Sequence, residues 1–290
     1  MPNVMRTGGG GRAKGGKVEY SVWAKPVNLD VGRYGHVSIA DAAGNVYVAG
    51  GGTAIGVATN SIEKYSQSGK SASLTLSVAR RYLAATSNPL PGGGVYIGGG
   101  ESGDGRTYYA TVDFIQADGT KGANLAMSDA KRDLAATTDG NGVVYFGGGF
   151  GKAGMSAVVD KFSGTSKTSA TPLNVARMQL AAATDGVGNV LFAGGNTGAA
   201  RSAVVEKYPM SGAKVNMTGL SVARSKLAAA TDGAGNVWFA GGELNSVQSA
   251  VDKYTPDGVR TTYTLSVARS KLAAATDGAG NVLFAGGTTI

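Results

Sequence analysis

The stretch SVARSKLAAATDGAGNV occurs twice in this chain, at residues 221–237 and again at residues 266–282. Weaker copies precede these two, each with a basic residue ahead of an alanine-rich run. Consecutive basic residues lie 45 to 51 positions apart, and self-similarity at such a period is typical of an array of equal structural units. Taken as anchors of the copies, they are Arg33, Arg80, Lys131, Arg177, Arg224 and Arg269.

Each copy reads as four short strands. In the fifth copy we expect strands at residues 227–231, 237–240, 250–254 and 261–267. The sequence DGAGN between the first two strands favours a tight turn, because Asp, Asn and Gly tolerate the positive φ of hairpin turns. Four-stranded units of this length predict a β-propeller, in which the units are blades around a common axis.

The composition agrees with an all-β chain. Glycine accounts for 48 of the 290 residues, and glycine doublets recur where each second strand ends. Alanine in the first strand suits the crowded axis of a propeller. Larger side chains in the second strand, such as Phe192, Phe239 and Phe284, are expected to fill the wider space between blades.

The two ends of the chain are expected to share one blade. The sixth copy stops at Ile290 after its second strand, while Val18-Glu19-Tyr20 resembles the third strand of the other copies. We therefore expect a chain that is complete at its C-terminus and has six blades, the last closed by N-terminal third and fourth strands that join C-terminal first and second strands. A flexible, basic, glycine-rich arm at residues 1–16 precedes this propeller domain of residues 17–290.

The set of repeated features resembles the kelch repeat over about residues 17–290. The features are an arginine before the first strand, a glycine doublet after the second, and Val-[Glu/Asp]-x-[Tyr/Phe] in the third, as in Val205-Glu206-Lys207-Tyr208. The tryptophan usual in the fourth strand is missing, and Leu76, Leu173 and Leu220 take its place. The sequence of the repeats also looks like that of glycine- and alanine-rich kelch-like proteins of bacteriophages and bacteria. This resemblance implies a role on a virus particle or in host contact.

No catalytic constellation can be assembled from these residues. Kelch propellers include copper oxidases and six-bladed propellers include sialidases, but the chain has no cysteine and one histidine, and no sialidase-like set of arginines, tyrosine and acids is visible. His36 is interpreted as a packed or hydrogen-bonded first-strand residue, since a tetrahedral zinc site would need further ligands of suitable type. We expect no enzyme activity, no cofactor and no metal.

Two rings of polar residues follow from the repeat. The six anchors should circle the axis near one face, where we expect them to bind backbone carbonyls, with attraction of an anionic group as the alternative. Asp41, Asp139, Asp185, Asp232 and Asp277 should circle the other face. They are expected to accept hydrogen bonds from turn amides, with ion binding as the alternative.

The loops between second and third strands vary most among the copies, and variable loops on a rigid scaffold often carry recognition. The candidate binding residues in these loops are Tyr108, Tyr109, Phe150 and Arg201. Ordinary loop variation is the alternative interpretation. The small number of aromatic residues argues against sugar stacking.

Charge and hydropathy restrict the partners. The net charge is +8, and Arg6, Arg12, Lys14 and Lys17 contribute to it. This group could anchor the chain to an assembly, but no aromatic residue is interleaved before Tyr20, which argues against nucleic-acid binding. No apolar run is long enough for a signal peptide or a membrane span.

We therefore expect a non-enzymatic binding or structural module, associated with a phage particle or tail, that presents loops to a host surface or a protein. A protein partner in a larger assembly is expected, a host-surface glycan or protein is a further candidate, and a homo-oligomer stays open. The main alternative is a cytoplasmic kelch-type adaptor for protein interactions. A glycan-active enzyme is the remote alternative.

Overall fold

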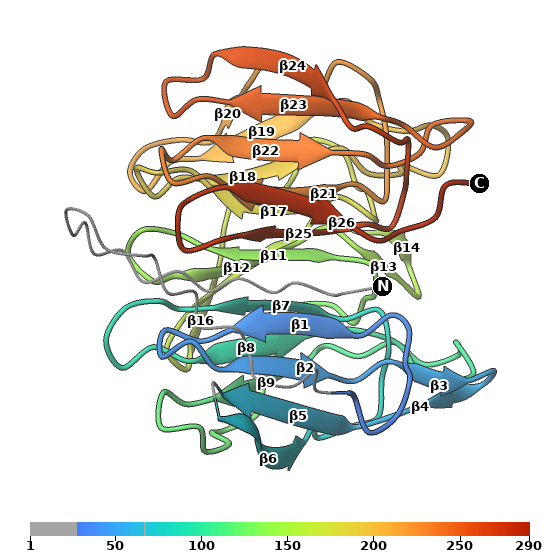
Figure 1. The fold of residues 1–290 in the computed structure, drawn as a ribbon, viewed down its shortest axis with the longest axis vertical. Helices are drawn as coiled ribbons and strands as arrows, with labels where there is room; N and C mark the ends of the chain where they lie inside the picture. The colour runs from blue at the N-terminus through green and yellow to red at the C-terminus, as the bar shows by residue number, and fades with distance from the viewer. Residues whose placement is uncertain (1–27, 67) are drawn as a thin grey trace, which may run out of the picture.

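The computed structural model describes residues 28–66 and 68–290, and within these ranges the chain is all-β, built from antiparallel sheets without a helix (Figure 1). Five sheets have four strands each, and we name them units 1 to 5. Unit 1 contains β1 (Val37–Ala40), β2 (Val46–Ala49), β5 (Ser61–Ser66) and β6 (Gly69–Thr75). Unit 2 contains β7 (Ala84–Ser87), β8 (Val95–Gly98), β9 (Thr111–Ile115) and β10 (Leu125–Ala126).

The next three units repeat this order. Unit 3 contains β11 (Ala135–Thr138), β12 (Val144–Gly147), β15 (Val159–Ser163) and β16 (Ser166–Ser169). Unit 4 contains β17 (Ala181–Thr184), β18 (Val190–Ala193), β19 (Val205–Tyr208) and β20 (Val215–Asn216). Unit 5 contains β21 (Ala228–Thr231), β22 (Val237–Ala240), β23 (Ala250–Tyr254) and β24 (Arg260–Thr264), so the four strands expected in this copy are confirmed with small shifts at their ends.

Smaller sheets complete the architecture. Unit 6 has two described strands, β25 (Ala273–Thr276) and β26 (Val282–Ala285). Two hairpins were not expected from the sequence: β3 (Gly52–Ala54) with β4 (Val57–Ala58), and β13 (Phe150–Gly151) with β14 (Gly154–Met155). The first of them projects from the body of the molecule (Figure 1), and its tip residue Ile55 is fully exposed.

The core lies between neighbouring units. Phe192 and Phe239 on the second strands are fully buried. Phe239 packs with Leu191 and Val205 of unit 4, so its expected position between units is confirmed. Leu173 and Leu220, which replace the fourth-strand tryptophan, are also buried in these clusters. The four junctions from unit 1 to unit 5 repeat this apolar packing.

The first strands follow one another in space, from β1 through β7, β11, β17 and β21 to β25. Threonine hydroxyls link some of these neighbours. Thr231 Oγ1 donates to the Thr184 carbonyl, and Thr276 Oγ1 donates to the Thr231 carbonyl, both at 2.6 Å. Within the described residues no such link joins β25 to β1, so closure into a ring stays a prediction, and residues 17–27 lie outside the described part.

Buried ion pairs hold the outer strands of each unit to its anchor. The guanidinium groups of Arg80, Arg177 and Arg224 are fully buried. Each lies 2.7 to 2.8 Å from a third-strand carboxylate, namely Asp113, Glu206 and Asp252. Each carboxylate also accepts a backbone N–H three residues ahead of the anchor, from Ser77, Asn174 and Ser221. Charges buried in this way are tolerated because they are paired and hydrogen-bonded.

These pairs predict that the fold is lost in acid. Burial works to raise the pKa of Asp113, but Arg80 and Lys121 beside it hold that pKa below its usual value. A carboxyl with a lower pKa in the folded state stabilises the fold above its unfolded pKa near 4 and loses that contribution as the pH falls further. We expect the urea midpoint to be level near neutrality and to fall below about pH 4.5. A midpoint that stays constant down to pH 2.5 would contradict this expectation.

Candidate binding surface at the loop end

One end of the units gathers two kinds of segment, and we call it the loop end. The residue after each anchor forms an isolated backbone bridge with the residue after each glycine doublet. The bridges are Tyr34 with Gly52, Arg81 with Glu101, Arg132 with Phe150, Met178 with Asn196, Ser225 with Glu243, and Ser270 with Thr288. The loop between second and third strands is thus tied to the segment that enters the first strand.

A line of backbone hydrogen bonds connects the units at this end. The next position along the chain has positive φ in every unit, at 53 to 57° in five side-chain-bearing residues. From unit 2 to unit 6, the N–H at this position donates to the equivalent carbonyl of the preceding unit, as Asp133 does to Tyr82 and Lys226 to Gln179. The residues are Gly35, Tyr82, Asp133, Gln179, Lys226 and Lys271. Left-handed backbone is uncommon for such residues, so a fixed scaffold sets where their side chains start.

Units 1 to 3 carry a cluster of aromatic rings and guanidinium groups at the loop end. Arg81 lies over the rings of Tyr34 and Tyr82, at 5.7 and 5.2 Å from the ring centres. Arg132 lies over the rings of Tyr82 and Phe150, at 5.7 and 5.5 Å. Arginine and aromatic faces alternate across three units, and cation–π contacts of this kind hold both side chains in place.

Glu101 joins the two arginines. Its carboxylate lies 3.0 Å from Nη2 of Arg81 and 2.9 Å from Nε of Arg132. The Arg81 guanidinium also donates to the Tyr34 hydroxyl at 2.6 Å. Glu101 is almost fully buried, and its contacts with both arginines hold their side chains in place. We name Tyr34, Arg81, Tyr82, Glu101, Arg132 and Phe150 the arginine–aromatic cluster.

Asp133 borders this cluster and differs from the other carboxylates. Burial raises the pKa of Asp133, and the nearby Glu101 acts in the same direction, while Arg132 and Lys226 oppose them. The pKa shift of Asp133 is therefore opposite in direction to that of Asp113. The contribution of Asp133 to stability is present at low pH and falls as the pH rises through its folded-state pKa. Protonation of Asp133 makes the loop end more positive.

The structure brings two of the four predicted loop residues into the cluster. The Tyr108 ring packs edge-on against Phe150 with centroids 5.9 Å apart, and Tyr108 also bridges to Glu101 through the backbone. Tyr109 lies beside them, where its N–H donates to the Gly100 carbonyl at 2.9 Å. Arg201 lies elsewhere, because its loop belongs to unit 4.

Glu101 with Arg81 and Arg132 forms what we call the aromatic clamp. Arg201 belongs to an equivalent group without aromatic rings, made of Glu243, Arg201 and Lys226, which we call the polar clamp. Glu243 occupies the position equivalent to Glu101 and lies 3.1 Å from Arg201 and 2.6 Å from Lys226. Burial works to raise the pKa of Glu243, but the two cations hold it below its usual value. No aromatic ring contact accompanies this clamp in the described residues. The two clamps therefore share geometry but differ in aromatic surface.

Most of the six anchor side chains are buried. Arg80, Lys131, Arg177 and Arg224 are fully buried, so these four cannot form a surface that attracts anions. Arg80, Lys131 and Arg224 donate to backbone carbonyls as expected, whereas Arg177 pairs with the Glu206 carboxylate. Lys131 pairs with Asp129 at 2.7 Å and more loosely with Asp160. The side chain of Arg33 is buried against Glu63, whereas Arg269 is partly exposed.

The other predicted residues have simpler outcomes. His36 is half-buried, and burial lowers its pKa. The turn aspartates accept backbone N–H groups, as Asp232 does from Ala234 and Asn236, so their expected role is confirmed. The arm residues Arg6, Arg12, Lys14 and Lys17 lie outside the described part of the chain.

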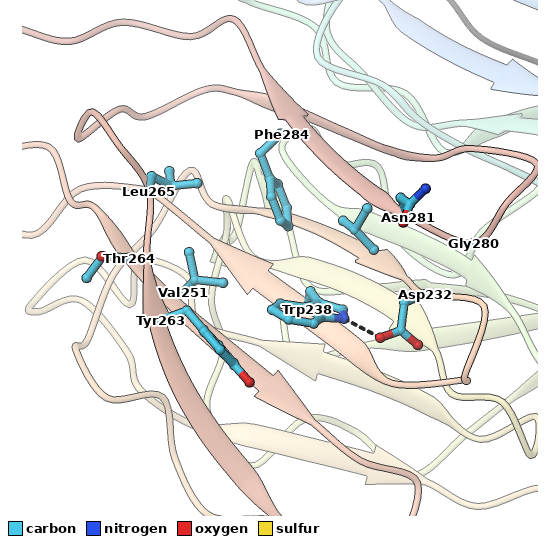
Figure 2. A pocket seen from close by; sticks show the side chains of 10 residues that line it. Asp232, Trp238, Val251, Tyr263, Thr264, Leu265, Gly280, Asn281 and Phe284 are labelled. Atoms are coloured by element: carbon cyan, nitrogen blue, oxygen red, sulfur yellow. Dashed lines mark hydrogen bonds between the residues drawn. The ribbon is translucent and has the colours of Figure 1, made fainter.

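A groove of mixed polar and apolar lining lies between units 5 and 6, beside β26. Trp238, Tyr263 and Leu265 line it from unit 5, and Val282 and Phe284 line it from unit 6. In Figure 2 these side chains surround an open space, with the Trp238 indole donating to Asp232 at 2.8 Å. Trp238 is half-buried within the described residues.

Sequence reasoning missed Tyr34, Arg81, Tyr82, Glu101 and Arg132. The search was directed at the long loops, whereas these residues lie next to the anchors and the glycine doublets. A signal was present, since the position after the anchor changes from Tyr, Arg and Arg to Met, Ser and Ser along the copies.

Comparison with known proteins adds no relative: no protein-family model matches the chain, and no curated protein matches it. Over residues 28–66 and 68–290 there is no helix able to cross a membrane. The same residues contain no group of three or more histidine or acidic side chains arranged to hold a metal ion.

Proposed function

We propose that the chain is a non-enzymatic binding module that contacts a protein partner through the arginine–aromatic cluster of units 1 to 3. The observation that supports this proposal is the placement of Arg81 and Arg132 between the rings of Tyr34, Tyr82 and Phe150. Arginine and tyrosine are enriched among residues that dominate the energy of protein interfaces. Rings and guanidinium groups that are already ordered lose little freedom on binding.

The internal repeat supports a functional reading of this cluster. Positions that maintain the fold stay constant along the chain, such as the anchors and the glycine doublets. The loop-end positions instead become aromatic and arginine-rich only in the first half. Folding alone does not require this, because unit 5 builds the same bridge with Ser225 and Glu243.

We further propose that the six units close into a propeller of the kelch type. Every junction from unit 1 to unit 6 repeats one packing pattern, and β26 carries one unpaired edge within the described residues. Closure by the N-terminal segment would cover the groove beside Trp238 and remove that edge. The kelch resemblance rests on the repeated sequence features.

Association with a phage particle or tail remains our leading proposal for the setting of this module, and it rests on the sequence resemblance. Mass spectrometry of gradient-purified particles from the source culture tests it. Co-sedimentation of the chain at a stoichiometric level supports a particle component. Recovery only in the soluble fraction would contradict it and favour the adaptor alternative.

Two matched double variants test the binding surface. Arg81→Ala with Arg132→Ala removes the two cations of the aromatic clamp, and Arg201→Ala with Lys226→Ala removes those of the polar clamp. We expect the first pair to weaken binding to the particle at least about 30-fold, as loss of a hot spot does, and the second to change it less than about 3-fold. Competition with labelled wild-type chain measures both.

Equal losses from the two double variants would contradict the assignment of the surface to units 1 to 3. The remote enzymatic alternative has its own check. Turnover of any substrate in a broad glycoside panel, well above that of a heat-denatured sample, would overturn the non-enzymatic proposal.

A further inference from the structure

The β3–β4 hairpin of unit 1 carries an apolar residue at its tip. Ala54 pairs with Val57, so the turn between the two strands consists of Ile55 and Gly56. Gly56 has φ of +77°, which accounts for the glycine. Ile55 is fully exposed and Val57 is 50% exposed, on a hairpin that projects from the body of the molecule (Figure 1). Turns ordinarily use Gly, Asn, Asp, Ser or Pro, so the local backbone does not explain the isoleucine.

The hairpin of unit 3 shows that the fold does not require an apolar tip. It also begins directly after a glycine doublet and encloses a two-residue turn, because Gly151 pairs with Gly154. The turn residues there are Lys152 and Ala153, and both are exposed. The same structural element therefore accepts a charged side chain where unit 1 presents isoleucine.

The base of the β3–β4 hairpin belongs to the arginine–aromatic cluster. The ring of Tyr34 lies against Gly52, where a Cβ atom would be 2.5 Å from Cζ of the ring. The backbones of the same two residues exchange hydrogen bonds of 3.0 and 2.8 Å. Because the Tyr34 hydroxyl also accepts a hydrogen bond from Arg81, the apolar tip and the cluster form one continuous surface.

A loop of unit 2 supports the hairpin from the side. Gly103 lies against it so closely that a Cβ atom there would be 2.3 Å from the Gly56 carbonyl oxygen and 2.6 Å from the Ala58 nitrogen. The Asp104 carboxylate orders this loop by accepting the N–H of Arg106 at 3.1 Å. A tip that is supported at its base and on its side loses little freedom when it binds.

We infer that Ile55 is the apolar anchor of the binding surface: its side chain inserts into a pocket of apolar side chains on the protein partner, while the arginine–aromatic cluster contacts the rim of that pocket. This inference rests on the proposed function, and it adds an anchoring residue and the chemistry of the site that receives it. Exposed apolar surface on a soluble protein is typical of contact sites when it adjoins other such residues.

The size of the tip favours a protein pocket over a lipid bilayer. Burial of one isoleucine side chain strengthens binding about 10- to 100-fold. A gain of this size is that of a hot spot when the cluster supplies further contacts beside it. It is too small to hold the chain on a bilayer, since a whole myristoyl chain gives only marginal membrane binding.

The anchor is tested with Ile55→Lys, which gives unit 1 the kind of tip that unit 3 has. Because Ile55 is fully exposed, the urea midpoint should equal that of the wild-type chain. We expect binding to gradient-purified particles, measured by competition with labelled wild-type chain, to weaken about 10- to 100-fold. Val187→Lys is the matched control: Val187 is 55% exposed on a turn at the opposite end, and its change should cost less than about 3-fold.

An environment-sensitive dye tests the apolar character of the receiving site. The chain has no native cysteine, so Ile55→Cys can be labelled with acrylodan at that position alone. The emission should shift to the blue when the labelled chain binds particles, and the shift should vanish when the particles are first digested with protease. Acrylodan on Val187→Cys should show no shift. A blue shift at position 55 on vesicles of phosphatidylcholine and phosphatidylglycerol would identify a lipid anchor and overturn the inference.

The Arg81→Ala, Arg132→Ala double variant separates this inference from the proposed function. If that variant binds weakly while Ile55→Lys binds like the wild-type chain, the anchor is rejected and the cluster is retained as the binding surface. If neither variant binds more weakly than the wild-type chain, or if the wild-type chain does not bind the particles, both proposals are rejected. Weak binding by both variants, with a blue shift that depends on particle protein, is the result we expect.

Discussion

The variant Arg224→Met is expected to unfold at a much lower urea concentration than the wild-type chain, with a loss of about 3–5 kcal/mol. Arg224 is fully buried, and its guanidinium lies 2.8 Å from Asp252. Without it, Asp252 keeps the N–H of Ser221 and a distant Arg260 as partners, but its charge stays in a site closed to water. Methionine has similar length, so the lost charge rather than lost volume dominates the effect.

Urea unfolding followed by circular dichroism measures this loss. Arg106→Met is the control, because Arg106 is exposed on a loop and should change stability by less than about 0.5 kcal/mol. Adding Asp252→Leu to Arg224→Met removes the uncompensated charge and should restore part of the loss. If Arg224→Met is as stable as the control, the buried pairs do not hold the third strand of each unit to its anchor.

The second large effect is expected at a glycine doublet. Gly194 has φ of +67°, and a Cβ atom there would lie 2.6 Å from the Arg224 carbonyl oxygen and 3.0 Å from Cδ2 of Leu227. Gly194→Ala should therefore lose roughly 1–2 kcal/mol from the left-handed backbone and a further 1–3 kcal/mol from crowding between units 4 and 5. The unfolding midpoint of the purified variant measures the sum.

Gly164→Ala separates the two causes. Gly164 has φ of +57°, and its Cβ would meet no atom within 4 Å. It should therefore show the backbone cost without the crowding cost. Equal losses at Gly164 and Gly194 would mean that the doublet is required only for its backbone angle and not for the close approach of the next unit.

The repeat made most of the strands predictable from the sequence. Residues 237–240 and 250–254 coincide with β22 and β23, because each run is bounded by turn residues that end pairing on both sides. The fourth strand was expected to reach residue 267, whereas β24 ends at Thr264. The N–H of Leu265 still donates to the Ser249 carbonyl, which is the next pair in the register of Ala250 with Thr264.

The acidic partners of the anchors could not be predicted from the sequence, because the order of the strands in space decides which residues meet. The basic residue and the third-strand acid were both visible as repeated features, but Arg177 and Glu206 are separated by a complete hairpin in the sequence. Only the antiparallel order of β17, β18 and β19 brings them together. A ring of exposed charge was consequently considered for residues that the structure buries.

The arginine–aromatic cluster was hidden for a different reason. Arg81 and Arg132 belong to different units, and the residues that join them, Tyr82 and Glu101, come from two separate segments. Spacing within one repeat does not reveal contacts between repeats. Of the loop residues chosen from variability, Tyr108 and Phe150 reached the cluster because their loops start at the same bridges.

Hydrogen exchange, measured by mass spectrometry on the free chain and on the chain in particles with which it co-sediments, tests the central claim most directly. Contact through the arginine–aromatic cluster predicts slower exchange in residues 50–58, 81–82, 101–109, 132–133 and 150–155, with little change around Arg201 and Lys226. Protection confined to the opposite turns, at residues 139–142, 185–189 and 232–236, would contradict the claim that the loop end of units 1 to 3 is the binding surface.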